Sequence, residues 1–344
     1  MSSHENWERF LAAARGEHTD RVPVVLIVDS PWMPGFVGMD TLDFFLFPDR
    51  WLAAHFTIME RFPDVVFVPG FWVEYGMANE PSAFGTPILW RHDAPPALRH
   101  VSLPPAQWDT LARPDPQTDG LMPLVLRRLE DLERRGGLPD PHRIHFVAAR
   151  GPLALATHVL GTTAFLEATA AEPDAAHYVL DVFTDTVIAF LQAQLDCLRE
   201  PQGILMLDDI VGMLSPRAFK RMALPYLQRI FDAFDGLIRI YHNDTPCAHL
   251  LPHLPEARFD VFNFSHESEI GAVRAAMGPQ IALMGNVAPL AVLAQGTPEQ
   301  VESDARACID AMQGQGGFML SAGGGVSIGT PAENIDALVR AARG

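Results

Sequence analysis

Cysteine and long apolar runs are both scarce in this chain of 344 residues. Three cysteines are an odd number, which suits reduced thiols better than a disulfide framework. No stretch of about 18 uncharged apolar residues occurs, and the polar amino terminus lacks the apolar core of a secretory signal. We therefore expect a cytoplasmic protein without a membrane segment.

Basic side chains are also few, with 25 Lys and Arg against 42 Asp and Glu and a formal net charge of −17. Such a charge repels a phosphate backbone unless a local patch is strongly basic. The longest basic clusters are Arg127-Arg128 and Arg134-Arg135, a spacing typical of one solvated helix face. We predict no nucleic-acid partner.

What the chain does contain is a regular alternation of short apolar, often β-branched runs with longer helical segments. This pattern predicts a parallel sheet wrapped by helices. Eight runs indicate an α/β protein, a (β/α)8 TIM barrel that forms a single domain over residues 1–344. The expected strands are 22–28, 64–68, 144–149, 203–207, 237–241, 261–264, 281–284 and 317–320.

Proline after Ser or Thr marks several helix starts. Ser215-Pro216 predicts a helix to about residue 234, Thr297-Pro298 one over 301–312, and Thr330-Pro331 the last helix. A long helix is expected from about residue 174 to 198, and an amino-terminal helix over 6–15 is expected to close the lower end of the barrel.

One proline-rich segment interrupts the alternation between the second and third strands. Residues 72–143 form an insertion in which we expect one helix, near 123–135. A connection of this length is usually functional. We expect it to form a lid or one wall of the pocket.

Several sequence blocks carry a family resemblance. Residues 205–209 (LMLDD), 214–216 (LSP), 284–287 (MGNV), 296–301 (GTPEQV) and 329–335 (GTPAENI) resemble the uroporphyrinogen decarboxylase superfamily, and follow its methylcobamide:coenzyme M methyltransferase branch. The resemblance implies a barrel enzyme whose chemistry lies at the carboxyl ends of the strands.

The resemblance also implies a zinc ion, held by a His-x-Cys pair after the fifth strand and a cysteine after the eighth, that activates a substrate thiol. This chain keeps His242, but Asp244 and Gly324 stand at the two cysteine positions. We therefore expect either one divalent ion (zinc, iron or manganese) on His242, Asp244 and another carboxylate, or no metal. Asp244 could instead cap a helix, and Cys247 is expected to be a buried residue inside that helix.

Asp208 and Asp209 end the fourth strand as adjacent acids. Neighbours on a strand point to opposite faces, so we expect one carboxylate in the pocket and the other on backbone amides, with Asp209 favoured for the pocket. Asp209, His242 and Asn286, which ends the seventh strand, are the predicted catalytic residues. The predicted substrate-binding residues are Glu74, Tyr75, Asp208 and His266.

Loop residues near other strand ends are weaker candidates. Arg150 and His158 follow the third strand, where a loop hydrogen bond is as plausible as catalysis. The glycines at 323–325 could approach an anion, but they lack the spacing and lysine of a P-loop, so a tight turn is the simpler interpretation.

The leading functional hypothesis is a methyltransferase or demethylase that acts on a small methylated substrate, with a corrinoid protein as partner. A uroporphyrinogen decarboxylase-like lyase is one alternative. That family places arginines just after the first strand, whereas residues 28–35 (VDSPWMPG) are acidic and apolar here. A non-catalytic ligand-binding barrel is the other alternative. In such a barrel, polar side chains at the strand ends would cost free energy if they were left without hydrogen-bond partners. The oligomeric state is left open.

Overall fold

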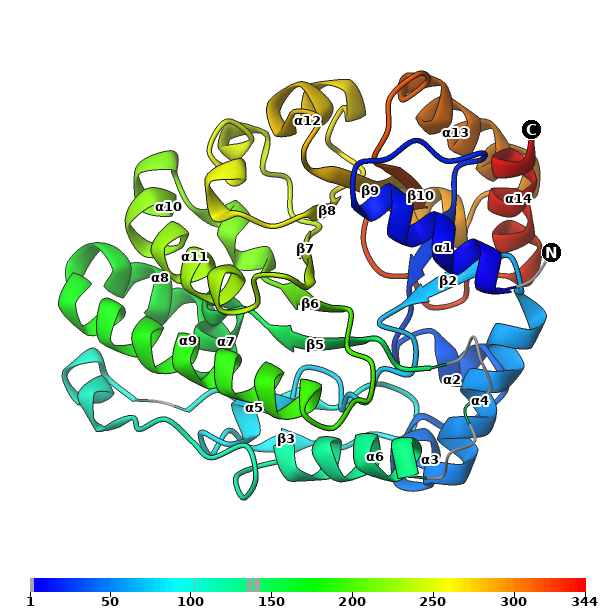
Figure 1. Cartoon of the computed structure of the whole chain (residues 1–344). Coiled ribbons are helices and arrows are strands. Elements are labelled where there is room, and N and C mark those ends of the chain that lie inside the picture. The colour runs from blue at the N-terminus through cyan, green and yellow to red at the C-terminus, as the bar shows by residue number, and fades with distance from the viewer. Residues whose placement is uncertain (1–2, 102, 135–137, 139–142) are drawn as a thin grey trace.

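A computed structural model describes residues 3–101, 103–134, 138 and 143–344. Its centre is a sheet of eight parallel strands that curls into a nearly closed barrel (Figure 1). Hydrogen bonds join the strands in the order β2-β1-β10-β9-β8-β7-β6-β5. The strands are β1 (Val24–Ile27), β2 (Val65–Val68), β5 (Phe146–Arg150), β6 (Gly203–Leu207), β7 (Ile238–Asn243), β8 (Val261–Phe264), β9 (Ala282–Val287) and β10 (Phe318–Ala322).

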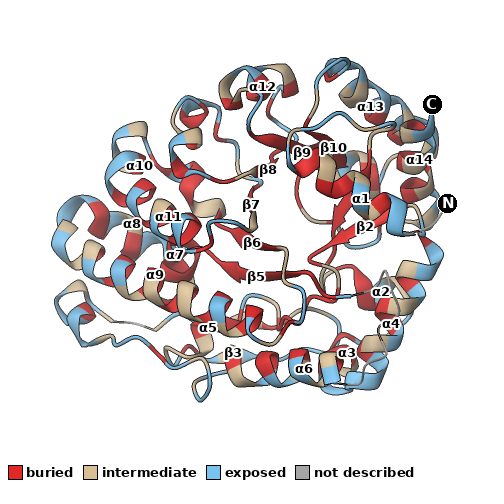
Figure 2. Ribbon diagram, in the orientation of Figure 1, coloured by how far each residue is buried: buried red, intermediate tan, exposed pale blue. Residues whose placement is uncertain are grey.

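Helices surround the barrel strands, which are buried except for the start of β7, and the outer helix faces are exposed (Figure 2). The predicted TIM-barrel fold is confirmed. The α-helices are α1 (Ser3–Ala14), α2 (Met33–Phe36), α3 (Thr41–Leu46), α4 (Pro48–Arg61), α5 (Asn79–Ser82), α6 (Met122–Arg134), α7 (Pro152–Leu160), α8 (Thr162–Ala171), α9 (Pro173–Leu195), α10 (Pro216–Met222), α11 (Leu224–Ala233), α12 (Ile270–Met277), α13 (Pro298–Ala311) and α14 (Ala332–Arg343).

Alternate residues of each strand enter two separate apolar clusters. Val25 and Ile27 of β1 belong to the cluster inside the barrel, whereas Val24 and Leu26 join the larger cluster between strands and helices. Phe10 and Leu11 of α1 join the inner cluster, so α1 closes the end of the barrel where the strands begin, as predicted. The opposite end, where the strands finish, is the mouth.

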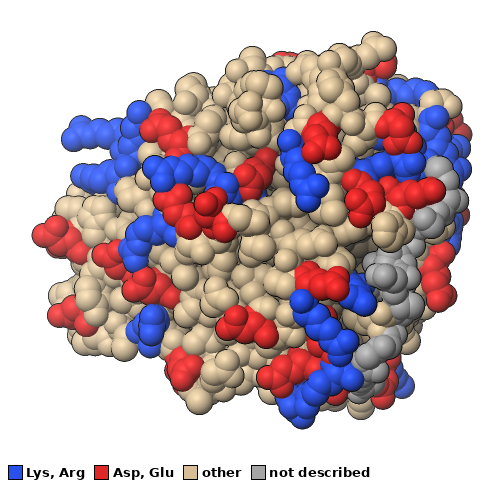
Figure 3. Space-filling model, viewed as in Figure 1, with Lys and Arg blue, Asp and Glu red and all other residues tan. Residues whose placement is uncertain are grey.

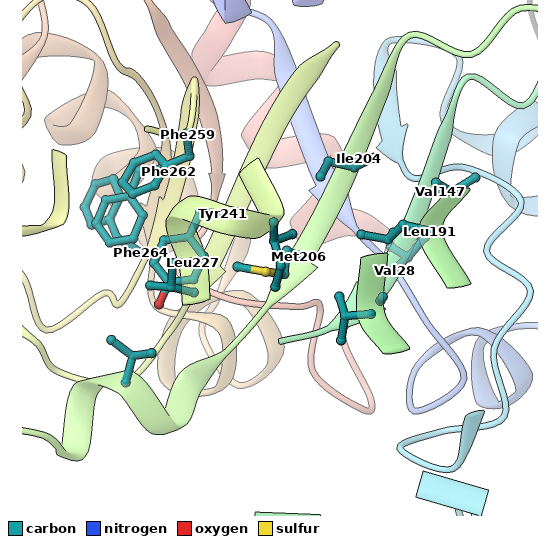
Figure 4. Packing of buried hydrophobic residues seen from close by; sticks show 14 of the residues in the cluster. Val28, Val147, Leu191, Ile204, Met206, Leu227, Tyr241, Phe259, Phe262 and Phe264 are labelled. Atoms are coloured by element: carbon teal, nitrogen blue, oxygen red, sulfur yellow. The ribbon is translucent and has the colours of Figure 1, made fainter. Parts of the chain in front are cut away.

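Aromatic rings fill part of the outer layer beside β7 and β8. The Tyr241 ring lies 5.2 Å from that of Phe259 and 5.8 Å from that of Phe262, and Phe264 continues the stack (Figure 4). These large rings anchor the outward faces of both strands. The same alternation therefore fixes which residues of β7 and β8 face inward.

The expected helix over 216–234 is wrong, because the structure has two helices, α10 and α11, that break at Ala223. Pro225 has no amide hydrogen to donate to the carbonyl of Arg221, so one continuous helix cannot form. The expected helix after Asp244 is also wrong: the segment continues into a 3-10 turn, η3 (Ala248–Leu250), and Cys247 precedes that turn. The last helix starts one residue later than predicted, with Pro331 at the N-cap.

The insertion contains the expected helix as α6; the expected end of that helix, residue 135, lies outside the described residues. It also contains a short antiparallel hairpin, β3 (Ile88–Leu89) and β4 (Ala97–Leu98), and the 3-10 helix η1 (Pro105–Thr110). Further irregular turns are the 3-10 helices η2 (Asp209–Met213) and η4 (Leu254–Ala257) and the π-helical η5 (Pro289–Ala294).

On the face shown in Figure 3, acidic and basic side chains are interspersed. Among the described helices, none is both long and apolar enough to span a bilayer.

Candidate functional site

The inward faces of four adjacent strands end in polar side chains at the mouth. Leu205 and Leu207 of β6 belong to the inner cluster, so Asp209 continues that face. Ile238 and Ile240 place His242 in the same way on β7. By this alternation Arg150 and Asn263 also face inward, above inner-cluster residues of β5 and β8. The fold therefore gathers these four side chains at the end of the barrel where TIM-barrel enzymes hold their active sites.

Asn263, a residue that the sequence analysis missed, sets the ring orientation and the neutral tautomer of His242. The Asn263 side-chain amide donates to the carbonyls of Met284 (2.8 Å) and Ala322 (3.1 Å). Both carbonyls only accept, so the amide oxygen must face His242 Nδ1, 2.6 Å away. Nδ1 therefore carries the hydrogen and donates it, and the lone pair is on Nε2.

Two carboxylates flank that free nitrogen. His242 Nε2 lies 3.5 Å from Asp209 Oδ1 and 3.9 Å from Asp244 Oδ2. The imidazole is 5% exposed and the carboxylates are 39% and 44% exposed, so the group opens toward solvent on its acidic side. Burial, and next the charge of Asp209, raises the pKa of Asp244. The structure thus brings together three residues predicted from the sequence.

Asp208 faces the other way. Its carboxylate accepts hydrogen bonds from the amides of Leu153 (3.0 Å) and Ala154 (2.8 Å) in the first turn of α7, and it is fully buried. Those amides have no partner within the helix, so Asp208 caps α7 from a neighbouring strand. The substrate-binding role predicted for Asp208 does not agree with this geometry, whereas the expected division of the two acids does.

Asn286 also differs from its predicted catalytic role. Its amide nitrogen donates to the carbonyls of Ser265 (3.2 Å) and Ser268 (2.8 Å), which uses both hydrogens. Its oxygen lies 3.7 Å from the thiol of Cys308 on α13, outside the barrel. Asn286 therefore ties the loop after β8 to β9, and the structure does not bring it to His242.

Tyr75 and His266, two predicted substrate-binding residues, lie apart from each other. The Tyr75 ring is buried against Phe45 and Trp90, with the Arg128 guanidinium 5.7 Å from its centre, so it belongs to the packing of the insertion and not to the His242 group. His266 is exposed after β8, beside Gly323. Its substrate-binding role stays a prediction.

A second charged group lies where β1, β2 and β5 end. Glu74, almost fully buried, accepts the amide of Ser30 at 2.9 Å. Glu80 accepts the amide of Arg150 at 2.8 Å, and the Arg150 guanidinium donates to the Gly76 carbonyl and stacks over Trp72. The start of the insertion thus forms one wall of the mouth, as expected for part of that segment.

Two acids of this group, Asp29 and Glu80, were not singled out from the sequence. Burial, with the nearby charge of Glu74, raises the pKa of Asp29 to about 7. Burial and the charge of Arg150 lower the pKa of His158 to about 4, so His158 is neutral at pH 7. Carboxylates outnumber cations on this side of the mouth.

The residues present do not fit a zinc thiolate centre. A Cβ added at Gly324 would lie 2.9 Å from Asp244 Oδ2, so the carboxylate occupies the space that a side chain at 324 would need. Cys247 is fully buried, and burial raises the pKa of its thiol to about 11. Among the described residues, this thiol does not belong to the group of side chains that could share an ion with His242.

The sequence model of the uroporphyrinogen decarboxylase (URO-D) family matches residues 5–344. The chain belongs to this family. Its relatives include enzymes of two kinds. A uroporphyrinogen decarboxylase of Azoarcus sp. (strain BH72) is 31% identical over 175 residues, 48% of this chain and 47% of that protein. A methylated-thiol–coenzyme M methyltransferase of Methanosarcina mazei is 28% identical over 279 residues, 78% of this chain and 71% of that protein.

The chain therefore matches only about half the length of the decarboxylase. Among solved structures, a methyltransferase from Methanosarcina mazei superimposes with a TM-score of 0.83 at 21% identity, over 97% of both chains. A B12-independent methionine synthase from Shewanella sp. W3-18-1 gives a TM-score of 0.58 at 10% identity. At these identities the structural matches show the fold alone.

Proposed function

We propose that this chain is an enzyme that moves a methyl group to or from a small molecule bound at the mouth, with a corrinoid protein as the methyl-carrying partner. One observation supports it most: the lone pair of His242 Nε2 is directed between Asp209 and Asp244 at the active-site end of the barrel. The longer match to the methyltransferase of the family supports the same choice.

The geometry suits activation of a nucleophile. In methyl transfer the nucleophile attacks the methyl carbon, the bond from that carbon to the leaving group breaks, and the leaving group takes the electron pair. A neutral nucleophile must also lose a proton. One of the basic groups at the mouth, the imidazole or a carboxylate, can accept that proton, and the remaining negative charge stabilises the positive charge that develops. Asn263 keeps Nε2, and not Nδ1, as the ring nitrogen that faces the mouth.

The acidic side chains at this side of the mouth do not suit the substrate of the decarboxylase alternative. Asp29 follows β1 at the position where the resemblance implies arginines. Arg150 is close to three acids, Asp29, Glu74 and Glu80, and its guanidinium already donates to the Gly76 carbonyl. A substrate with many carboxylates would be repelled by this wall.

The test is a methyl-transfer assay with methylcobalamin as the probe for the corrinoid. The purified chain is mixed with small alcohols, phenols, amines and thiols, and loss of the methyl–cobalt bond is followed by visible absorption. We expect turnover with at least one class, reduced at least about 100-fold in His242→Gln, and unchanged in Asp310→Asn, an exposed control on α13. Release of carbon dioxide from the porphyrinogen, or ligand binding without any turnover, would contradict the proposal.

A further inference from the structure

We propose that Asp209, His242 and Asp244 hold one divalent cation through an imidazole nitrogen and two carboxylate oxygens, and that this ion binds an oxygen or nitrogen nucleophile in place of a thiol. The ion itself is inferred from the geometry alone. The class of nucleophile rests in addition on the proposed methyl transfer.

The distances suit a shared ion. One ligand atom from each residue lies within 4.8 Å of the other two. Two atoms that are each about 2.1 Å from a metal lie roughly 3.0 to 4.2 Å apart, depending on the angle between them. The separations of 3.5 Å and 3.9 Å from Nε2 fall in that range. Little movement is required for binding.

The His242 imidazole is oriented by residues other than Asp209 and Asp244. Metal-bound histidines usually donate the other ring N–H to a fixed acceptor, which orients the ring. Here Nδ1 donates to Asn263, which is itself held by two backbone carbonyls. His242 is buried, and within the described structure its Nε2 makes only the two long contacts with the carboxylates. The lone pair of Nε2 is therefore available to a ligand that enters the mouth of the barrel.

The ligand atoms set the chemistry of the ion. Oxygen and imidazole ligands suit manganese, iron or zinc with open, water-filled positions, whereas thiolates select a softer site. Gly324 contributes no side chain, and its lack of a Cβ leaves room for the Asp244 carboxylate. Because Asp209 and Asp244 are partly exposed, the ion would have coordination positions free for substrate. Such an ion acidifies bound water, an alcohol or a phenol.

The experiment measures ion binding directly. Protein stripped with a chelator is titrated with Mn2+ by calorimetry and with Co2+ by visible absorption. We expect one ion per chain and visible Co2+ bands without a thiolate charge-transfer band. His242→Ala and Asp209→Asn should each weaken binding at least about 10-fold, while Cys247→Ser and the exposed control Asp310→Asn should leave it unchanged. Circular dichroism verifies that each variant is folded.

A further variant should add a band to the Co2+ spectrum, so that the test does not depend on a loss of binding alone. Asp244→Cys should add a thiolate band to the Co2+ spectrum, because the new sulfur lies beside the ion. No binding, binding unaffected by His242→Ala, or a thiolate band in the unaltered protein would overturn the inference. Ion binding without methyl transfer would refute the proposed function alone, and methyl transfer by metal-free protein would refute only the role of the ion in binding the nucleophile.

Discussion

Replacement of Asn263 by leucine tests the most specific feature of the site, the fixed tautomer of His242. Leucine has a similar size, but it cannot accept the Nδ1 hydrogen. The buried Nδ1–Oδ1 hydrogen bond spans 2.6 Å in the intact protein. A hydrogen bond of this kind contributes roughly 1 to 1.5 kcal/mol. Its loss should shift the ratio of the two neutral tautomers about tenfold toward Nε2–H.

The same substitution also costs stability, for a separate reason. The carbonyls of Met284 and Ala322 lose their Asn263 donor inside the barrel. Each buried group left without a partner costs about 1 to 3 kcal/mol. We therefore expect the free energy of unfolding to fall by roughly 2 to 6 kcal/mol in denaturant titration. That loss alone says nothing about the tautomer.

The assay is a long-range proton–nitrogen NMR spectrum of protein with labelled histidine, in which His242 is assigned from its absence in His242→Gln. Asn286→Leu is the matched control. It likewise removes an amide from two carbonyls, those of Ser265 and Ser268, but it does not contact His242. An unchanged Nδ1–H tautomer in Asn263→Leu, or an equal shift in Asn286→Leu, would refute the reasoning.

Three further predictions concern stability. Asp208→Ala should lower the free energy of unfolding by about 1 to 2 kcal/mol, because two amides of α7 lose their cap; denaturant titration measures it, and no change would contradict the cap. Gly203→Ala should cost about 1 to 3 kcal/mol, since a Cβ there would lie 2.5 Å from the Ile238 carbonyl oxygen; an equally stable variant would contradict this packing. The pKa of Asp29 is raised from 3.8 to about 7, so its protonated form stabilises the fold at low pH, and that stability is lost as pH rises from about 4 to about 7. Asp29→Asn should flatten the fall in Tm between about pH 4 and about pH 7, and an unaltered fall would show that Asp29 is not its source.

The strands were predictable from apolar runs, but their ends were not. The fifth run was expected to stop at residue 241, whereas β7 continues to Asn243, which pairs with Phe264 of β8. The seventh run likewise ended too early, because β9 continues to Val287. At both strand ends polar residues interrupt the apolar pattern while the backbone ladder goes on. In a TIM barrel these are the positions that carry function.

The missed residues depend on tertiary contacts that no local pattern contains. Glu80 meets Arg150 across 70 residues of chain. Asn263 lies inside an apolar run, so it does not mark the end of a strand. It lies two residues after Val261, which faces the interior of the barrel, and a buried amide there requires hydrogen-bond partners. His242, Asp209 and Asp244 were accessible because they follow strands, and strand ends converge at the mouth.

The register of the sheet ultimately decides which of two adjacent polar residues faces the mouth. Leu207 of β6 pairs with His242 of β7. Asp209 and Asp244 each lie two residues further along, on the same inward face, so their carboxylates meet above the imidazole. A register shift of one residue in β6 would exchange Asp208 with Asp209 and would leave α7 without its cap. The apolar residues Leu205 and Leu207 oppose that shift, because it would move them out of the inner cluster. The apolar interior of the barrel thus positions the acids that we propose bind the ion.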